Sequence, residues 1–202
     1  LIMMVIFFAM GYPFPSFLTD ANFLLGATVI AQAFSIYFLY LLLKRKNIDI
    51  KNYLRLGTVG GKEIGLMLLG FIVASGAVEI VSNLLDIEPN QMMMDLITNG
   101  HIVLVFFTLT VFAALSEELF FRGLLFKELE VRYGGGITIA VTSLGFALAH
   151  ALQYQLAEVG LVVLLAVVMG YIRYKWQNIY IPIGVHFLNN FMSFVFFFYV
   201  YE

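Results

Sequence analysis

The sequence predicts an all-α, polytopic membrane protein, and three observations support that fold class. Hydrophobic residues make up 62% of the 202 residues and charged residues only 12%, whereas soluble domains carry about 25% charged residues. The apolar residues form long runs, most of them long enough to cross a ~30 Å hydrocarbon core as a helix. Lys and Arg occur in alternate connections between these runs. We therefore expect one integral membrane domain over residues 1–202, a transmembrane helical bundle of about seven spans.

The spans follow from the apolar runs and from the residues that end them. The first run, Leu1–Met10, ends at Gly11 and Pro13, and we interpret it as a truncated first span. Gly134 and its two glycine neighbours are expected to form the turn between the fourth and fifth spans. The other spans are expected at Phe23–Leu43, Lys62–Leu85, Ile102–Phe126, Ile137–Ala151, Leu156–Ile172 and Ile179–Tyr199.

The distribution of charge supports this span count. Alternating the spans places ten of the eleven basic residues on one side of the membrane, and the eleventh, Arg122, lies inside the fourth span. The opposite connections contain acidic residues and no Lys or Arg: Asp20, Asp86, Glu88, Asp95 and Glu158. Because basic residues mark cytoplasmic loops, we expect the basic side to be cytoplasmic.

Composition also excludes several classes of function. The chain contains no cysteine, which rules out disulfides, thiolate metal sites and a cysteine nucleophile. The net charge is -2, and the longest basic run is Lys44-Arg45-Lys46. We therefore expect the lipid bilayer to be a partner and nucleic acid not to be one.

Three charged residues inside the fourth span require an explanation. Glu117, Glu118 and Arg122 interrupt a stretch that is otherwise free of charge, and an unpaired charge at the centre of a spanning helix costs about 3 kcal/mol. Glu118 and Arg122 are four residues apart, the spacing of an ion pair on one helical face. Glu117 points about 100° away from Glu118. We therefore expect Glu118 to be held by Arg122 while Glu117 faces another partner.

Further polar residues lie in the fifth and seventh spans. His150 follows Phe146 by four residues, and Asn190 follows His186 by four, with Asn189 expected to turn aside. At 1.5 Å per residue, Glu117 and His150 both stand ~20 Å from the turn that joins their spans, and His186 stands ~12 Å from the start of its own span. Ionisable residues inside a membrane are by default candidates for a functional site. We predict that these side chains meet in one pocket.

These three motifs resemble the signature of a known family. Glu117-Glu118-x-x-x-Arg122, Phe146-x-x-x-His150 and His186-x-x-x-Asn190 are similar to the motifs of the CPBP intramembrane proteases, which include CAAX prenyl proteases and the bacteriocin-processing and bacteriocin-immunity (Abi) proteins. The motif-bearing core covers about residues 102–199. The resemblance implies an intramembrane endopeptidase in the cell membrane, with its active site opening toward the cytoplasmic side.

The resemblance also implies a role for each motif residue. Glu117 would activate water, and Glu118 with Arg122 would support the site. His150 and His186 would orient the water or bind a metal, and Asn190 would stabilise an oxyanion. A zinc site needs three protein ligands and one open position, and the candidates are Glu117, His150 and His186. The sequence leaves open whether the protein uses no cofactor or one divalent metal such as zinc, and we favour the metal-free interpretation.

Two other functions remain open from the sequence. A non-catalytic bacteriocin-immunity or scaffold protein would retain protection or partner binding when Glu117 or His150 is replaced by Ala. A proton-coupled transporter would also use membrane Glu and His residues, although the sequence contains no internal duplication of the kind that many transporters have. The sequence does not identify the peptide or protein that would be cleaved.

Overall fold

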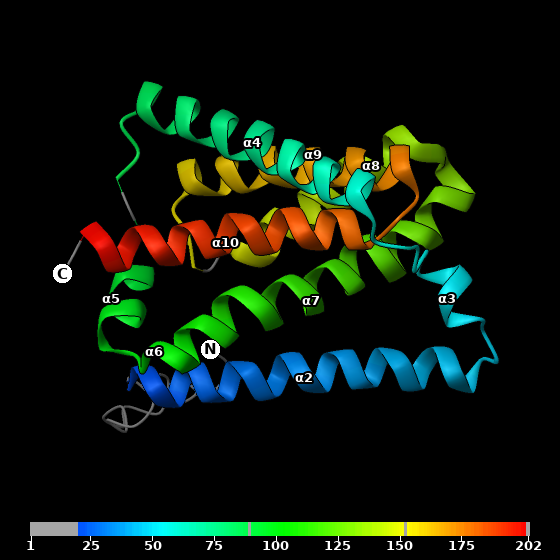
Figure 1. Cartoon of the computed structure of the whole chain (residues 1–202), viewed down its shortest axis with the longest axis horizontal. Helices are drawn as coiled ribbons and strands as arrows, with labels where there is room; N and C mark the ends of the chain where they lie inside the picture. Colours follow the sequence, from blue (N-terminus) through cyan, green and yellow to red (C-terminus); the bar gives the residue numbers. More distant parts are fainter. Residues whose placement is uncertain (1–19, 89, 152, 201–202) are drawn as a thin grey trace, which may run out of the picture.

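The computed structural model describes residues 20–88, 90–151 and 153–200. The truncated first span predicted at Leu1–Met10 lies outside the described residues. Within them, every regular element is a helix, and the long helices lie side by side in one bundle (Figure 1). The predicted fold class, an all-α membrane bundle, is confirmed.

The helices agree closely with the predicted runs. Asp20 begins the first described helix by accepting a hydrogen bond from the backbone N–H of Phe23 (2.8 Å), as an N-cap residue does. Gln177 ends the helix Leu156–Trp176 in the left-handed conformation, with φ at 49°. The elements in order are α2 (Ala21–Arg45), α3 (Ile50–Tyr53), α4 (Gly61–Leu84), α5 (Gln91–Asn99), α6 (Ile102–Phe106), π-helix η2 (Phe107–Phe112), α7 (Ala113–Glu118), π-helix η3 (Leu119–Leu125), α8 (Phe126–His150), α9 (Leu156–Trp176) and α10 (Tyr180–Val200).

Five helical runs in the described chain are long and apolar enough to cross a membrane. One of them, Ile102–His150, is 49 residues long and contains both the fourth and the fifth predicted spans. Gly134 interrupts it with φ at 72° and ψ at 172°, a backbone conformation that glycine adopts readily. The rings of Phe121 and Phe146, on either side of this break, are 5.1 Å apart. The run therefore folds back on itself at the predicted glycine turn.

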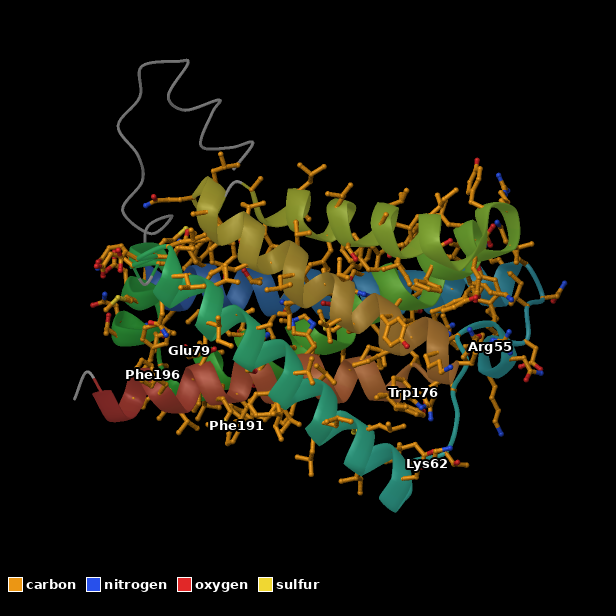
Figure 2. All side chains as sticks on the ribbon, turned by 90° about the horizontal axis from the view of Figure 1, so that it is seen from above. Arg55, Lys62, Glu79, Trp176, Phe191 and Phe196 are labelled. Atoms are coloured by element: carbon orange, nitrogen blue, oxygen red, sulfur yellow. The ribbon has the colours of Figure 1, made fainter. Side chains whose placement is uncertain are left out.

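The connections gather at the two ends of the bundle. At one end, the backbone N–H of Ile179 donates to the carbonyl of Arg55 (3.1 Å), joining the α9–α10 turn to the α3–α4 connection. At the other, the Asn90 amide donates to the carbonyl of Gln153 (3.1 Å). We call these the basic end (residues 44–62, 127–136 and 173–179) and the acidic end (residues 20–22, 85–88, 90–101, 151 and 153–158). Figure 2 shows Arg55 and Lys62 near the basic end and Glu79 near the acidic end.

The largest buried cluster joins four helices around the motif residue Phe146. Its members come from α4, α8, α9 and α10: Ala74, Phe146, Leu165, Ala166, Met169, Ile172, Ile181 and Val185. Gly70 allows close approach here, because a Cβ at that position would lie 2.6 Å from the Ile172 side chain and 2.8 Å from that of Val185. This packing fixes the helices that carry the second and third motifs.

Candidate active site

The ion pair predicted between Glu118 and Arg122 is present and fully buried. The Arg122 Nη1 atom lies 3.0 Å from Glu118 Oε1, and both side chains are 0% exposed. Arg122 Nη2 also donates to the carbonyl of Ala166 (3.0 Å), and the guanidinium lies 4.5 Å from the centre of the Phe146 ring. A buried ion pair persists only when further hydrogen bonds compensate for lost hydration. Arg122 thus binds α8 and α9 to the helix that carries both glutamates.

His186 is oriented by the same carboxylate. Its Nδ1 atom lies 3.0 Å from Glu118 Oε1, and the side chain is 5% exposed. Because a carboxylate paired with arginine accepts hydrogen bonds, Nδ1 is the donor in this contact. In a neutral imidazole, Nε2 is then the acceptor. Glu118 acts on the site through His186 and has no contact with the cavity described below.

His150 is held in the same tautomer by a different group. Its Nδ1 atom lies 2.8 Å from the backbone carbonyl of Phe146, and a carbonyl can only accept. The imidazole lies between two rings, with centroid distances of 4.7 Å to Phe146 and 5.8 Å to Tyr154. Contact with both rings restricts rotation of the imidazole. The Nε2 lone pair of His150 is consequently fixed in direction.

Glu117 lies opposite both imidazoles. Its Oε2 atom is 3.7 Å from His150 Nε2 and 4.0 Å from His186 Nε2. Oε2 is buried and has no hydrogen-bond partner among the described atoms. Three hydrogen-bond acceptors from α7, α8 and α10 thus surround one small space. Their separations exceed the ~3.2 Å limit of a direct hydrogen bond, and they suit a water molecule that donates to Glu117 and to one imidazole.

The same three atoms can be tested as zinc ligands. One carboxylate and two unprotonated imidazole nitrogens are groups that zinc accepts, and tetrahedral coordination at ~2.0–2.1 Å separates its ligands by ~3.4 Å. The measured 3.7 and 4.0 Å are wider. Among the described residues, no group of three or more His, Cys, Asp or Glu side chains has the geometry to hold a metal ion. As placed, these residues do not fit a tetrahedral zinc.

Asn190 connects α10 to the helix before the glutamates. Its amide Nδ2 donates to the carbonyl of Leu109 in η2 (2.8 Å), which leaves one of its two N–H bonds for another acceptor. Asn189 was expected to turn aside, and this expectation was wrong. It lines the same cavity and accepts a hydrogen bond from Ser75 Oγ (3.2 Å).

The two glutamates lie between two π-helical segments, which the sequence analysis did not predict. η2 precedes α7 and η3 follows it. A π-helical turn widens the helix and is frequent at functional sites. The Leu109 carbonyl that accepts from Asn190 belongs to the first of these segments. The local backbone therefore supports the arrangement that the motifs require.

The candidate residues line a cavity of about 540 Å³. Glu117, His150, His186 and Asn190 border it, whereas the buried Glu118 and Arg122 do not. This division matches the expected contrast between a free and a tethered glutamate. Much of the remaining wall is apolar, with side chains from α2, α5 and α10: Leu24, Leu25, Met92, Met93, Leu96, Ile97, Phe194 and Phe197.

The cavity reaches the acidic end of the bundle. Glu88, Asn90, Gln153 and Glu158 line it, and no described residue of the basic end does. A site opening toward the cytoplasm was expected together with a cytoplasmic basic end, whereas the described cavity is lined by residues of the acidic end. The physical reason is depth, because Glu117 and His150 stand ~20 Å from the turn at the basic end.

Tyr154 is a cavity residue that the motif analysis missed. Its ring stacks on His150, and burial, followed by the negative charges of Glu117 and Glu158, raises the pKa of its phenol to about 12. The hydroxyl therefore keeps its proton at neutral pH. The spacing could have identified it, because Tyr154 follows His150 by four residues and its backbone N–H donates to the His150 carbonyl (3.1 Å).

Comparison with known proteins identifies the part of the chain that carries this site. Residues 99–192 match the family model described as type II CAAX prenyl endopeptidase, Rce1-like. All seven motif residues fall within the match, whereas α2, α3 and α4 lie outside it. No curated protein and no solved structure matches the chain. The match over residues 99–192 therefore supports the resemblance of this part of the chain to the CPBP family of CAAX-type intramembrane proteases.

Proposed function

We propose that the protein is an intramembrane endopeptidase that hydrolyses a peptide bond with a water activated by Glu117. The observation that carries this proposal is the convergence of Glu117 Oε2 and the Nε2 atoms of His150 and His186, at 3.7 and 4.0 Å, on one space beside the cavity. All three atoms are acceptors in the tautomers that their neighbours impose. A water molecule placed there is oriented by hydrogen bonds and lies next to a carboxylate.

The chemical step uses groups from three helices. Glu117 takes a proton from the water, and the resulting hydroxide forms a bond to the carbonyl carbon of the scissile peptide. The N–H of Asn190 that Leu109 does not use donates to the oxyanion that develops. The C–N bond then breaks, and Glu117 returns its proton to the leaving amine. This scheme uses no metal ion, and the separations of 3.7 and 4.0 Å between the acceptors support that choice.

Glu118 and Arg122 act by holding this arrangement in place. Arg122 compensates the charge of Glu118, and Glu118 fixes His186 through Nδ1. Oε2 of Glu117, in contrast, has no hydrogen-bond partner among the described residues. We therefore assign Glu117, His150, His186 and Asn190 to the reaction itself, and Glu118 and Arg122 to positioning.

The substrate that this site suits is a membrane-associated peptide or protein. Much of the cavity wall is apolar, which favours a substrate segment delivered within or beside the bilayer. The lining residues at the acidic end support entry from that end. With the basic end in the cytoplasm of a cell-membrane protein, entry would then occur on the non-cytoplasmic side.

The test is cleavage of quenched fluorescent peptides by the purified chain in liposomes. The peptides are one with a farnesylated CAAX terminus and an unprenylated apolar peptide of equal length. We expect Glu117→Gln and His150→Ala to lower kcat by about 10²–10⁴-fold, the contribution typical of a general base. Glu79→Gln is the matched control, because Glu79 also lies in a spanning helix but is exposed, with Asn83 as its hydrogen-bond partner (2.9 Å).

Two results would contradict the proposal. Glu117→Gln that cleaves at the wild-type rate would exclude Glu117 as the base. Complete loss of wild-type activity with a zinc chelator, and its recovery with added zinc, would replace the metal-free mechanism with a metal-dependent one. We expect the chelator to leave the rate unchanged.

A further inference from the structure

Helix α2 forms one wall of the cavity, although it lies outside the residues that match the protease family. Leu25, Thr28 and Gln32 all border the cavity, and their spacing of three and four residues places them on one face of the helix. Helix α2 also packs against η2 and α7. The substrate cavity is therefore completed by a segment to which the family match assigns no role.

Gln32 is the unusual member of this face. Its Oε1 atom is buried and has no hydrogen-bond partner among the described atoms. It lies near the middle of the 25-residue spanning helix, where water is scarce. An unsatisfied buried polar group costs about 1–3 kcal/mol. Its position facing the cavity means that a bound molecule can supply the missing donor.

The packing of α2 against α6 and η2 gives the depth of Gln32. The hydroxyl of Thr108 donates to the carbonyl of Leu25 (3.3 Å), so these two residues are level. Both helical runs start at the acidic end and proceed in the same direction (Figure 1). Gln32 lies seven residues beyond Leu25, ~10 Å, and Glu117 nine residues beyond Thr108, ~13 Å. The free carbonyl and the proposed catalytic carboxylate therefore stand at similar depth in one cavity.

We propose that Gln32 is a substrate-binding residue, whose side-chain carbonyl accepts a hydrogen bond from a backbone N–H of the peptide close to the scissile bond. This inference rests on the proposed function and adds the residue that positions the substrate. An extended peptide in an apolar site must find partners for its N–H and carbonyl groups. Gln32 offers an acceptor from α2, and Asn189 and Asn190 offer amide groups from α10. A lipid hydrocarbon chain offers no donor to Gln32.

The experiment measures peptide binding and cleavage in Gln32→Leu, which retains the approximate size of the side chain and removes its acceptor. Binding of the same two fluorescent peptides is measured in the inactive Glu117→Gln background, and KM and kcat are measured in the active protein. We expect Kd and KM to rise about tenfold, corresponding to one hydrogen bond of ~1.4 kcal/mol. We expect kcat to change far less. The melting temperature should stay the same or rise, because an unsatisfied acceptor is removed.

Ser35→Ala is the matched control. Ser35 is an exposed polar residue on the same helix, and it bonds to the backbone carbonyl of Gln32 (2.7 Å) rather than to its side chain. Its Kd and KM should equal those of the wild type. A similar rise of Kd and KM in Ser35→Ala would show that the effect of Gln32→Leu comes from a disturbed helix, and it would overturn the inference.

The outcomes separate this inference from the proposed function. If the wild type cleaves and Gln32→Leu has unchanged Kd and KM, the inference fails and the protease proposal stands. If the wild type does not cleave but the peptides bind in a manner that depends on Gln32, the protease proposal fails and the binding site stands. A lower melting temperature with unchanged KM would show a structural role and overturn the inference, as would a lack of binding by both peptides.

Discussion

The side chain that connects the site to the bundle is Arg122. It contacts Glu118, Ala166 and the Phe146 ring, and Arg173 Nε donates to its backbone carbonyl (2.9 Å). Removing one partner of a buried ion pair leaves the other charge uncompensated, whereas replacing both with apolar groups can be nearly neutral. Stability and activity should therefore respond differently to single and double substitutions at this pair.

We expect Arg122→Leu to lower the free energy of unfolding by about 3–5 kcal/mol. The Glu118→Leu/Arg122→Leu double variant should recover most of that stability, because no unpaired charge remains. It should nevertheless stay inactive, since His186 has lost the acceptor for its Nδ1 hydrogen. Denaturant unfolding in detergent micelles, combined with the peptide-cleavage assay, measures both quantities. Full activity in the double variant would show that the Glu118–Arg122 pair is not needed to position His186.

At the scale of elements, the feature that matters most is the helical run through η2, α7 and η3. A π-helical turn releases backbone carbonyls from regular α-helical hydrogen bonding, and Asn190 of α10 donates to one of them, at Leu109. This contact fixes the helix before Glu117 relative to the helix that carries His186. The third motif therefore also contributes to the geometry of the first.

Asn190→Asp tests this coupling and the assignment of Asn190 to the oxyanion, because aspartate lacks the amide N–H donors. We expect kcat to fall by about 10²–10³-fold, as when an oxyanion donor is removed. Ser75→Ala, which removes the partner of the neighbouring Asn189, should keep the wild-type kcat. The measurement is the steady-state rate on the preferred peptide. An unchanged kcat in Asn190→Asp would exclude a role as oxyanion donor.

The limits of sequence reasoning are clearest at this scale. The ends of α2, α4 and α9 agree with the predicted spans within a few residues, because caps and apolar runs are local signals. The Glu118–Arg122 pair followed from helical spacing alone. The sequence contained no such signal for the π-helices, because the apolar residues around the glutamates are compatible with an α-helix and with a π-helix. The hydrogen bond from Asn190 to η2 joins two parts of the chain that are far apart in the sequence, so local signals could not predict it. Asn189 was misjudged for the same reason, since its partner Ser75 lies on α4.

At the scale of the whole molecule, the placement of the cavity and of the charges supports the proposed direction of access. The cavity reaches the acidic end, and the ten basic residues outside the site belong to the opposite connections. The depth of each motif residue along its helix could be counted from the sequence, but the walls of the cavity could not be predicted from it. They include α2 and α5, which carry no motif and approach the site only in the folded bundle.

The chain lacks cysteine, so single cysteines can report this orientation. We expect Gln153→Cys at the acidic end to react with a membrane-impermeant maleimide on intact cells, and Lys51→Cys at the basic end to react only after permeabilisation. Both positions are exposed. A saturating peptide should slow the labelling of Gln153→Cys, because Gln153 lines the cavity. Labelling of Lys51→Cys on intact cells would reverse the orientation.

The most direct test of the central claim, that Glu117 activates a water molecule, is a single turnover in water enriched in ¹⁸O. Mass spectrometry then compares the new carboxyl terminus of the product with the peptide of the enzyme that contains Glu117. A general base leaves its own oxygens unchanged, so we predict one ¹⁸O atom in the product and none in Glu117. Incorporation of ¹⁸O into Glu117 would show a covalent acyl intermediate and contradict the account.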